Sequence, residues 1–303
     1  MRADNAQAPI HYRPGPGHGW TRFAREFDNT FRTEGIGNVE EQPFNSRFAA
    51  FPPGHPAYYR YAVFQLYQSL LRRDRWNAFE QLRQTQHQET TKHKHVLEFG
   101  RTLLSWDLLI SVQHLFSIAE GVPHLLTDPV VVLDLGSGWG RLGHALLRIN
   151  AQATYVSVDI PETLLIAQHY LPKTLSGIRF YNYPHHKGRD LISRSELLTE
   201  PGAHFLGTHM LPHIENGAAD VFVNVFSFQE MTNTQVRCYF ADIDRLTRGH
   251  FYLQQVAATK YRDGFILVGD DYYPFLAHWQ RVFLRPCEHV PDYFEALYRI
   301  SRA

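Results

Sequence analysis

Neither sign of charge is in excess in this sequence. Its 303 residues include 30 Lys and Arg against 30 Asp and Glu, so the formal net charge is zero. No basic run is interleaved with aromatic residues. A balanced chain of this kind offers no electrostatic footprint for a polyanion, so we expect no nucleic acid among its partners.

Long apolar runs and cysteines are also scarce. No apolar run approaches the roughly 20 residues that span a bilayer, and the start of the chain lacks the apolar core of a signal peptide. Cys238 and Cys287 are the only cysteines, too few for a disulfide framework and without metal-ligand spacing. We therefore expect a cytoplasmic protein with reduced thiols and no membrane segment.

The periodicity of the chain changes near residue 125. Residues 1–20 are rich in Pro and Gly and lack periodic apolar residues, which is typical of a flexible arm. The stretches 57–86 and 103–121 carry apolar residues at helical spacing. Residues 1–125 are therefore predicted to form this arm and a helical cap.

Residues 126–303 are predicted to form an α/β domain, because apolar strands alternate there with amphipathic helices, as in parallel sheets. The C-terminal third is rich in aromatic residues and is expected to end in an antiparallel hairpin at the sheet edge. The strands before this hairpin are predicted at 130–136, 153–160, 204–211, 219–227 and 250–256, and helices at 141–149, 162–171 and 235–247.

Three closely spaced glycines follow the first of these strands: Gly136, Gly138 and Gly140. Such glycines are typical of a sharp strand-to-helix turn at which a ligand lies against bare peptide groups. The sixth position counted from Gly136 is Arg141, which excludes the dinucleotide fingerprint, and the absence of a following G-K-[ST] excludes a Walker loop. With Asp134, the pattern reads D-x-G-x-G-x-G and resembles motif I of class I methyltransferases.

This resemblance implies S-adenosyl-L-methionine as the cofactor and S-adenosyl-L-homocysteine as the product. The loop, including Ser137, would receive the amino-acid part of the cofactor through backbone groups. Asp159, at the tip of the second strand, would accept hydrogen bonds from both ribose hydroxyls. Ile160 is expected to cover one adenine face, and Met210 is expected near the same ring. A helix-entry turn without a ligand, and Asp159 as the N-cap of the next helix, remain alternatives.

Two longer segments resemble a bacterial family of sugar O-methyltransferases. YVSVDIPETLLIAQHYL (155–171) and DVFVNVFSFQEM (220–231) are similar to that family's D-[IL]-P-E and S-F-Q-E-M segments. One departure is Trp139, where such families often carry Tyr. The resemblance implies a Rossmann-like class I methyltransferase sheet, mostly parallel with an antiparallel C-terminal strand, under an N-terminal helical cap. It also implies methyl transfer to a hydroxyl of a sugar or a glycosylated small metabolite.

Methyl transfer to an alcohol requires positioning and benefits from a base. In open parallel sheets the reacting groups lie beyond the carboxyl ends of the strands, where the S-F-Q-E-M segment is expected. Glu230 is the first candidate for the general base, with capping of the following helix as its alternative. Gln229 is a candidate for holding the acceptor or the cofactor carboxylate. His209 is a second candidate base, and a purely structural role is its alternative.

No metal is predicted. His185 and His186 have no carboxylate at ligand spacing in the sequence, which favours a solvated loop over a metal site. Asp270 and Asp271 are compatible with Mg²⁺ without indicating it, and equally with an ordinary turn. The expected partner is a small-molecule acceptor. Transfer to a non-sugar oxygen, nitrogen or carbon, and cofactor binding without transfer, stay open, and the aromatic N-terminal helices are compatible with a homo-oligomer.

Overall fold

The computed structural model describes residues 56–84, 96–99, 102–260, 266–268, 273–289 and 292–301. The predicted arm over residues 1–20 lies outside this part of the chain, as do Asp270 and Asp271. Both cysteines are free thiols. Among the described helices, none has the length and apolarity needed to cross a membrane.

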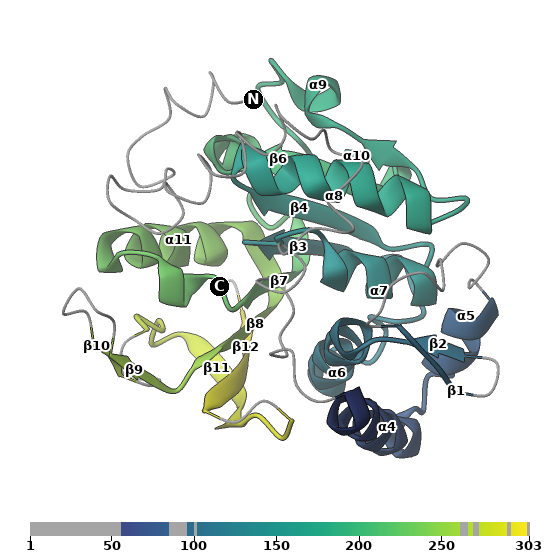
Figure 1. Ribbon diagram of the computed structural model, residues 1–303. Coiled ribbons are helices and arrows are strands. Elements are labelled where there is room, and N and C mark those ends of the chain that lie inside the picture. The colour runs from purple at the N-terminus through teal and green to yellow at the C-terminus, as the bar shows by residue number, and fades with distance from the viewer. Residues whose placement is uncertain are drawn as a thin grey trace, which may run out of the picture.

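Eight of the described strands form one mixed sheet (Figure 1). They are β3 (Val131–Leu135), β4 (Thr154–Asp159), β5 (Phe180–Tyr181), β6 (Gly202–Gly207), β7 (Ala219–Val225), β8 (Thr247–Val256), β11 (Trp279–Pro286) and β12 (Tyr293–Ile300). Their order across the sheet is β11-β12-β8-β7-β3-β4-β6-β5. Only β12 runs against its neighbours, since it pairs antiparallel with both β8 and β11 while the other pairings are parallel. The fold is thus a mostly parallel, Rossmann-like sheet with an antiparallel C-terminal hairpin, as predicted from the sequence.

The strand order creates a switch point between β3 and β7. After β3 the chain builds β4, β5 and β6 on one side of it, and then returns to add β7 and β8 on the other side. In open α/β sheets, ligands bind outside the carboxyl ends of the strands at such a point. The carboxyl end of β3 is Leu135, so the three-glycine loop begins at the switch point.

Different helices cover the two faces of the sheet (Figure 1). Alternate strand residues face opposite sides, so Val132 and Val131 belong to separate hydrophobic clusters. The Val132 cluster includes α4 (Pro56–Arg73), α5 (Ala78–Gln84), α6 (Trp106–Gly121), α7 (Arg141–Ile149) and α8 (Pro161–Thr174). The Val131 cluster includes α9 (Tyr183–His186), α10 (Arg194–Thr199), η3 (Thr208–His213), η4 (Phe228–Glu230) and α11 (Asn233–Leu246).

The N-terminal part is less uniformly helical than its periodicity predicts. A short antiparallel hairpin, β1 (Leu97–Phe99) with β2 (Thr102–Leu104), separates α5 from α6. A second such hairpin lies in the C-terminal part of the chain and pairs β9 (Ala258–Lys260) with β10 (Ile266–Val268). Ser105 caps the N-terminus of α6, and its hydroxyl accepts a hydrogen bond from the Leu108 amide. The helix is buried along most of its length. It therefore lies within the core cluster that joins α4, α7 and the sheet.

The strand predicted over 204–211 is wrong in its second half. Strand β6 ends at Gly207, and η3 follows. The reason is the length of its partner: β4 ends at Asp159, which stands opposite Gly207, so the ladder offers no pairing residue further on. His209 and Met210 consequently lie on a 3₁₀ helix beyond the strand and not at the end of the strand itself.

Candidate functional site

All three loop glycines adopt the left-handed conformation that side-chain-bearing residues avoid. Their φ angles are 77° at Gly136, 59° at Gly138 and 84° at Gly140. A Cβ at Gly136 would lie 2.1 Å from the Ser227 hydroxyl oxygen, and one at Gly140 would lie 2.8 Å from a methyl of Leu171. A Cβ at Gly138 would have nothing within 4 Å. Two of the glycines are therefore required by packing, whereas Gly138 faces open space.

The Asp159 carboxylate lies against this loop. Its Oδ2 accepts a hydrogen bond of 2.7 Å from the Gly138 amide, and its Oδ1 accepts one of 2.6 Å from the Ile160 amide. Burial raises the pKa of Asp159 to about 6, although hydrogen bonds from Thr163, Gly138 and Ile160 favour the charged form. Ile160 occupies the N-cap position of α8, so the alternative that Asp159 caps this helix is wrong. The glycine loop and Asp159, which are the two parts of the predicted cofactor site, are therefore adjacent.

Asp134 lies within β3, two residues before the loop, and is buried. The Tyr155 hydroxyl donates a hydrogen bond of 2.6 Å to its Oδ2. Burial raises the pKa of Asp134 to about 7, and the bond from Tyr155 acts in the opposite direction. The Ser137 hydroxyl is hydrogen-bonded to the hydroxyl of Ser157 at 2.7 Å inside the protein. The Ser137 side chain is therefore engaged inside the protein.

Asn224 joins the two strands that flank the switch point. Its Nδ2 donates to the Leu135 carbonyl at 2.8 Å and to the Ser227 hydroxyl at 2.6 Å, and its Oδ1 accepts from the Gln255 side chain at 2.6 Å. Asn224 is fully buried. These bonds hold the first residues of the glycine loop against the end of β7. Asn224 is not among the residues predicted from the sequence, although a single amide inside the apolar run of β7 is a usable signal.

A second group that the sequence analysis missed surrounds Phe226, the residue after β7. Its φ is 64°, which is unusual for a residue other than glycine. The Arg141 guanidinium lies 5.0 Å from the centre of its ring and 3.5 Å from an oxygen of Asp107. The ring of His114, from α6, approaches Phe226 with a centroid distance of 6.0 Å. Burial, reinforced by Arg141, holds the pKa of His114 well below its usual range, so its imidazole is neutral.

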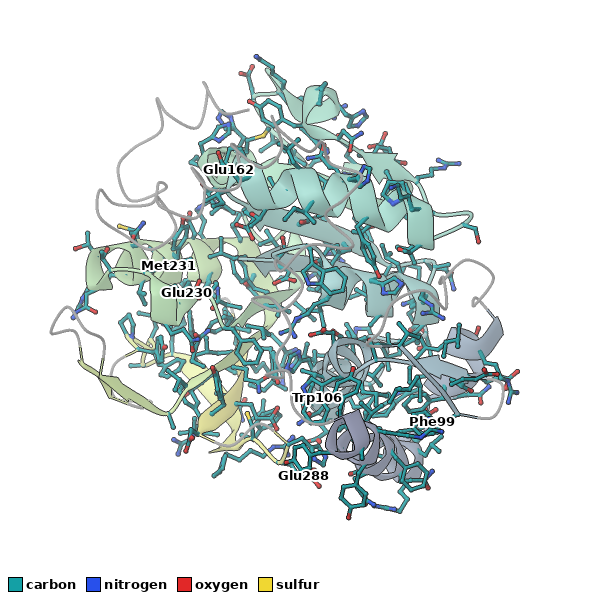
Figure 2. The ribbon with its side chains drawn as sticks, in the orientation of Figure 1. Phe99, Trp106, Glu162, Glu230, Met231 and Glu288 are labelled. Atoms are coloured by element: carbon teal, nitrogen blue, oxygen red, sulfur yellow. The ribbon has the colours of Figure 1, made fainter. Side chains whose placement is uncertain are left out.

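The predicted catalytic pair lies on η4. The Gln229 side chain accepts a hydrogen bond of 3.0 Å from the Val256 amide, which ties η4 to the end of β8. Glu230 ends η4, beside Met231 (Figure 2). The cap of α11 is Thr232, whose side chain forms a reciprocal capping box with Gln235. The alternative that Glu230 caps α11 is therefore wrong.

The two predicted residues on η3 have different surroundings. His209 shares a hydrogen bond of 3.3 Å with the Tyr183 hydroxyl, and the two rings meet edge to face. Met210 is 4% exposed and belongs to the hydrophobic cluster on the α11 face of the sheet.

The tip of the glycine loop packs against α8 through Trp139, whose ring meets that of Tyr170 edge to face, with a centroid distance of 4.8 Å.

The solvated loop predicted at His185 and His186 is wrong. The pair lies on the short helix α9, and His186 is fully buried. The reason is non-local, since α9 packs against β6 and α10, so that carboxylates distant in the sequence approach the imidazoles.

Comparisons with known proteins identify no family for this chain. No protein-family model matches it, and no curated protein matches it. Among solved structures, magnesium protoporphyrin IX methyltransferase from Synechocystis PCC 6803, with S-adenosylhomocysteine bound, matches at 12% identity and a TM-score of 0.44, covering 77% of this chain and all of that one.

Two further matches come from other organisms. An RNA methyltransferase from Salinibacter ruber, in complex with S-adenosyl-L-homocysteine, matches at 12% identity and a TM-score of 0.38, covering 64% of this chain and 92% of that one. Geranyl diphosphate C-methyltransferase from Streptomyces coelicolor A3(2) matches at 10% identity and a TM-score of 0.39, covering 64% and 79%. These likenesses are distant, so the case for a function rests on the geometry of the site itself.

Proposed function

We propose that this chain is a methyltransferase that uses S-adenosyl-L-methionine. The observation that carries this proposal is the loop over 136–140, in which three glycines adopt left-handed backbone conformations at the switch point of the sheet. Asp159, at the end of the neighbouring strand, stands 2.7 Å from the Gly138 amide. A backbone cradle next to a carboxylate suits a ligand that carries both an amino-acid part and a ribose.

The charges at the loop support a cationic nucleoside over a phosphate-bearing cofactor. Asp159 lies at this loop, and above about pH 6 its negative charge disfavours a pyrophosphate while it favours a positively charged sulfonium and ammonium. A carboxylate also accepts hydrogen bonds from ribose hydroxyls. The space beside Gly138, in which an added Cβ would meet nothing within 4 Å, fits a ligand that lies directly against the backbone.

Each predicted residue then has a distinct task in holding the cofactor. The peptide groups from Gly136 to Gly140, including that of Ser137, bind the amino-acid part. Asp159 binds the ribose, and Ile160 covers the adenine. Met210 and His209, both on η3, would lie near the adenine ring. Met210 belongs to the apolar cluster and is not part of an exposed surface.

Arg141 is an additional candidate for binding the cofactor carboxylate. It is the first residue of α7, directly after Gly140. Its buried Nη1 makes no hydrogen bond within the described residues, although it lies 3.5 Å from Asp107. A guanidinium nitrogen with unused donor capacity is well suited to a carboxylate.

We further propose that the acceptor is a hydroxyl group of a sugar or of a glycosylated small metabolite. The support is the similarity of segments 155–171 and 220–231 to the sugar O-methyltransferase motifs. The bound cofactor would supply an activated methyl group. Glu230 would take the proton from the acceptor hydroxyl, and Gln229 would position η4 through its bond to Val256. His209 is the second candidate base.

Two measurements test this function in sequence. Calorimetry of the full chain with S-adenosyl-L-methionine and S-adenosyl-L-homocysteine should show binding of one equivalent, and the absence of binding would contradict the whole proposal. Transfer of a labelled methyl group should then be measured with sugar nucleotides and glycosides, and in parallel with phenols and amines. Cofactor binding with transfer only to non-sugar acceptors would reject the sugar and retain the methyltransferase.

A further inference from the structure

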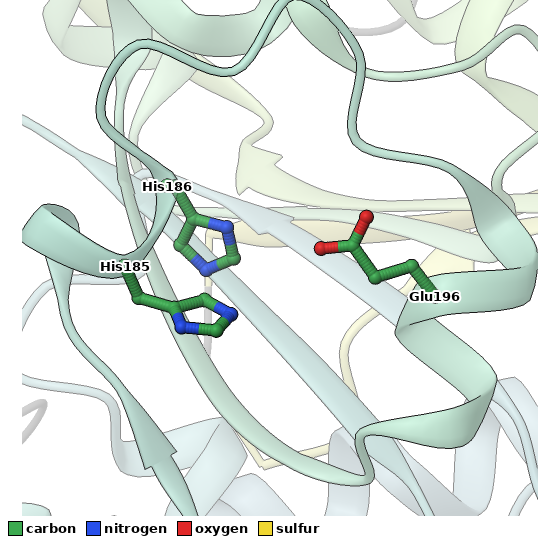
Figure 3. Close-up of side chains that lie close together, drawn as sticks. All are labelled: His185, His186 and Glu196. Atoms are coloured by element: carbon green, nitrogen blue, oxygen red, sulfur yellow. The ribbon is translucent and has the colours of Figure 1, made fainter.

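A cluster of metal-ligating side chains lies outside the cofactor loop, near the edge strand β5. It consists of His185 and His186 from α9 and Glu196 from α10, and we call it the His-His-Glu cluster. One ligand atom of each side chain lies within 4.8 Å of those of the other two. Figure 3 shows the two imidazoles close together with the carboxylate beside them, and the two rings meet edge to face with centroids 4.8 Å apart. The sequence does not reveal this cluster, because Glu196 lies ten positions after His186.

His186 supplies the second, independent observation. Its side chain is fully buried, and its Nε2 lies 3.2 Å from a ring nitrogen of His204. Its Nδ1 is also buried and makes no hydrogen bond within the described residues. Native proteins rarely leave a buried polar nitrogen without a partner, since doing so sacrifices its interaction with water. The orphaned nitrogen therefore points to a group that binds there.

We propose that the His-His-Glu cluster binds a divalent transition-metal ion, with zinc as the ion to be tested. Two imidazoles and one carboxylate are a common zinc ligand set, whereas magnesium and calcium prefer oxygen ligands alone. Ligand atoms around a tetrahedral zinc ion are about 3.4 Å apart, so small side-chain rotations are needed to close the set. Glu200, which lies 3.2 Å from His185 Nε2, is placed to serve as a fourth ligand.

Arg189 competes with the ion for the same ligands. Its Nη1 donates to the Glu196 carboxylate, and its Nη2 lies 3.2 Å from His185 Nε2. A metal ion can bind only when this guanidinium has left, because two cations cannot share these ligands. The Arg189 side chain is 33% exposed, so it has a path to solvent. The bound ion would then join α9 to α10 at the sheet edge, independently of any methyl transfer.

The test uses the full chain without an affinity tag, stripped of metal by a chelator and titrated with zinc against a chromophoric competitor. The sequence contains 18 His, so the comparison among variants decides the outcome. His186→Ala and Glu196→Gln should each weaken one zinc site by at least about tenfold, since loss of even an outer partner costs about 10- to 100-fold. Arg189→Gln should bind zinc more tightly than the wild type, because it removes the competing charge.

His169→Ala is the matched control. His169 lies on α8 and contacts Lys173 at 2.6 Å, away from the His-His-Glu cluster, so this variant should bind zinc as the wild type does. Cobalt substitution adds a spectroscopic readout, in which visible absorption bands of a tetrahedral ion should vanish in Glu196→Gln. Circular dichroism verifies that each variant is folded. The proposal is overturned if the wild type binds no zinc, or if His186→Ala and Glu196→Gln bind it as tightly as His169→Ala does.

Discussion

The Gly138→Ala variant distinguishes the effect of a lost ligand contact on cofactor affinity from the effect of backbone strain on stability. Gly138 has a φ of 59°, and an added Cβ would meet no protein atom within 4 Å. The folded protein should therefore suffer only the cost of a side-chain-bearing residue in the left-handed region, about 1–2 kcal/mol. For a chain of 303 residues, whose unfolding entropy is about 0.6 kcal/mol/K, that corresponds to a fall in Tm of about 2–3 °C.

The effect on cofactor binding should be larger than this strain explains. If the cofactor lies against the Gly138 peptide group, the new methyl occupies the ligand's space, and overpacking of this kind costs about 1–3 kcal/mol. Dissociation constants for S-adenosyl-L-methionine and its product should rise roughly 5- to 150-fold. Calorimetry measures the affinity, and thermal unfolding without ligand measures the strain.

Gly177 provides the matched control for this variant. Its φ is 76°, and a Cβ there would likewise have nothing within 4 Å, but it lies in the turn between α8 and β5 rather than in the glycine loop. Gly177→Ala should lower Tm by a similar amount and leave cofactor affinity unchanged. Gly136→Ala should instead destabilise the fold itself, because its Cβ would lie 2.1 Å from the Ser227 hydroxyl. Wild-type affinity in folded Gly138→Ala would refute the claim that a ligand contacts this loop.

The further predictions concern three carboxyl groups. Asp159→Asn removes a charged acceptor worth about 1.5–3 kcal/mol, so calorimetry should show cofactor affinity reduced roughly 10- to 150-fold. Wild-type affinity should also fall below about pH 6, where Asp159 takes up a proton, and a flat profile would argue against its role. The folded-state pKa of Asp134, about 7, lies above its ordinary value of 3.8, so the protonated group stabilises the fold at low pH and this contribution is lost as the pH rises from about 4 through 7. Thermal unfolding of Asp134→Asn should consequently depend less steeply on pH over that window than the wild type, and equal slopes would count against a protonated Asp134. Glu230→Gln should lower kcat for an alcohol acceptor by about 10²- to 10⁴-fold at unchanged cofactor affinity, and an unaltered kcat would remove Glu230 as the base.

The part of the site that the sequence predicts well is encoded locally. Gly136, Gly138 and Gly140 lie within five residues, and their spacing alone indicates the backbone conformations that the structure contains. The position of Asp159 near the glycine loop is predicted by the pattern of alternating strands and helices, because the carboxyl ends of adjacent parallel strands meet at one edge of the sheet. The same reasoning predicts the mixed sheet and its C-terminal hairpin, since each strand has its own apolar pattern.

Features that depend on contacts between distant segments could not be predicted in this way. The end of β6 is set by the length of β4, not by any signal in residues 204–211. His185 and His186 are brought to Glu196 and Glu200 by the packing of α9 and α10 near the edge strand. A search for ligand spacing along the sequence finds none of these pairs, because the relevant spacing exists only after folding.

The surroundings of Phe226 form the part of the proposed site that the glycine-loop motif does not describe. A left-handed φ at a residue other than glycine costs about 1–3 kcal/mol and persists only where neighbouring groups hold it. Here those neighbours are Arg141, which lies over the Phe226 ring, and His114, which meets its edge, and they come from α7 and α6. The surface beyond the end of β7 is therefore assembled from three segments, namely α6, the start of α7 and the segment over 220–231. We therefore expect acceptor preference to be set by that assembled surface and to differ between proteins that share the same glycine loop.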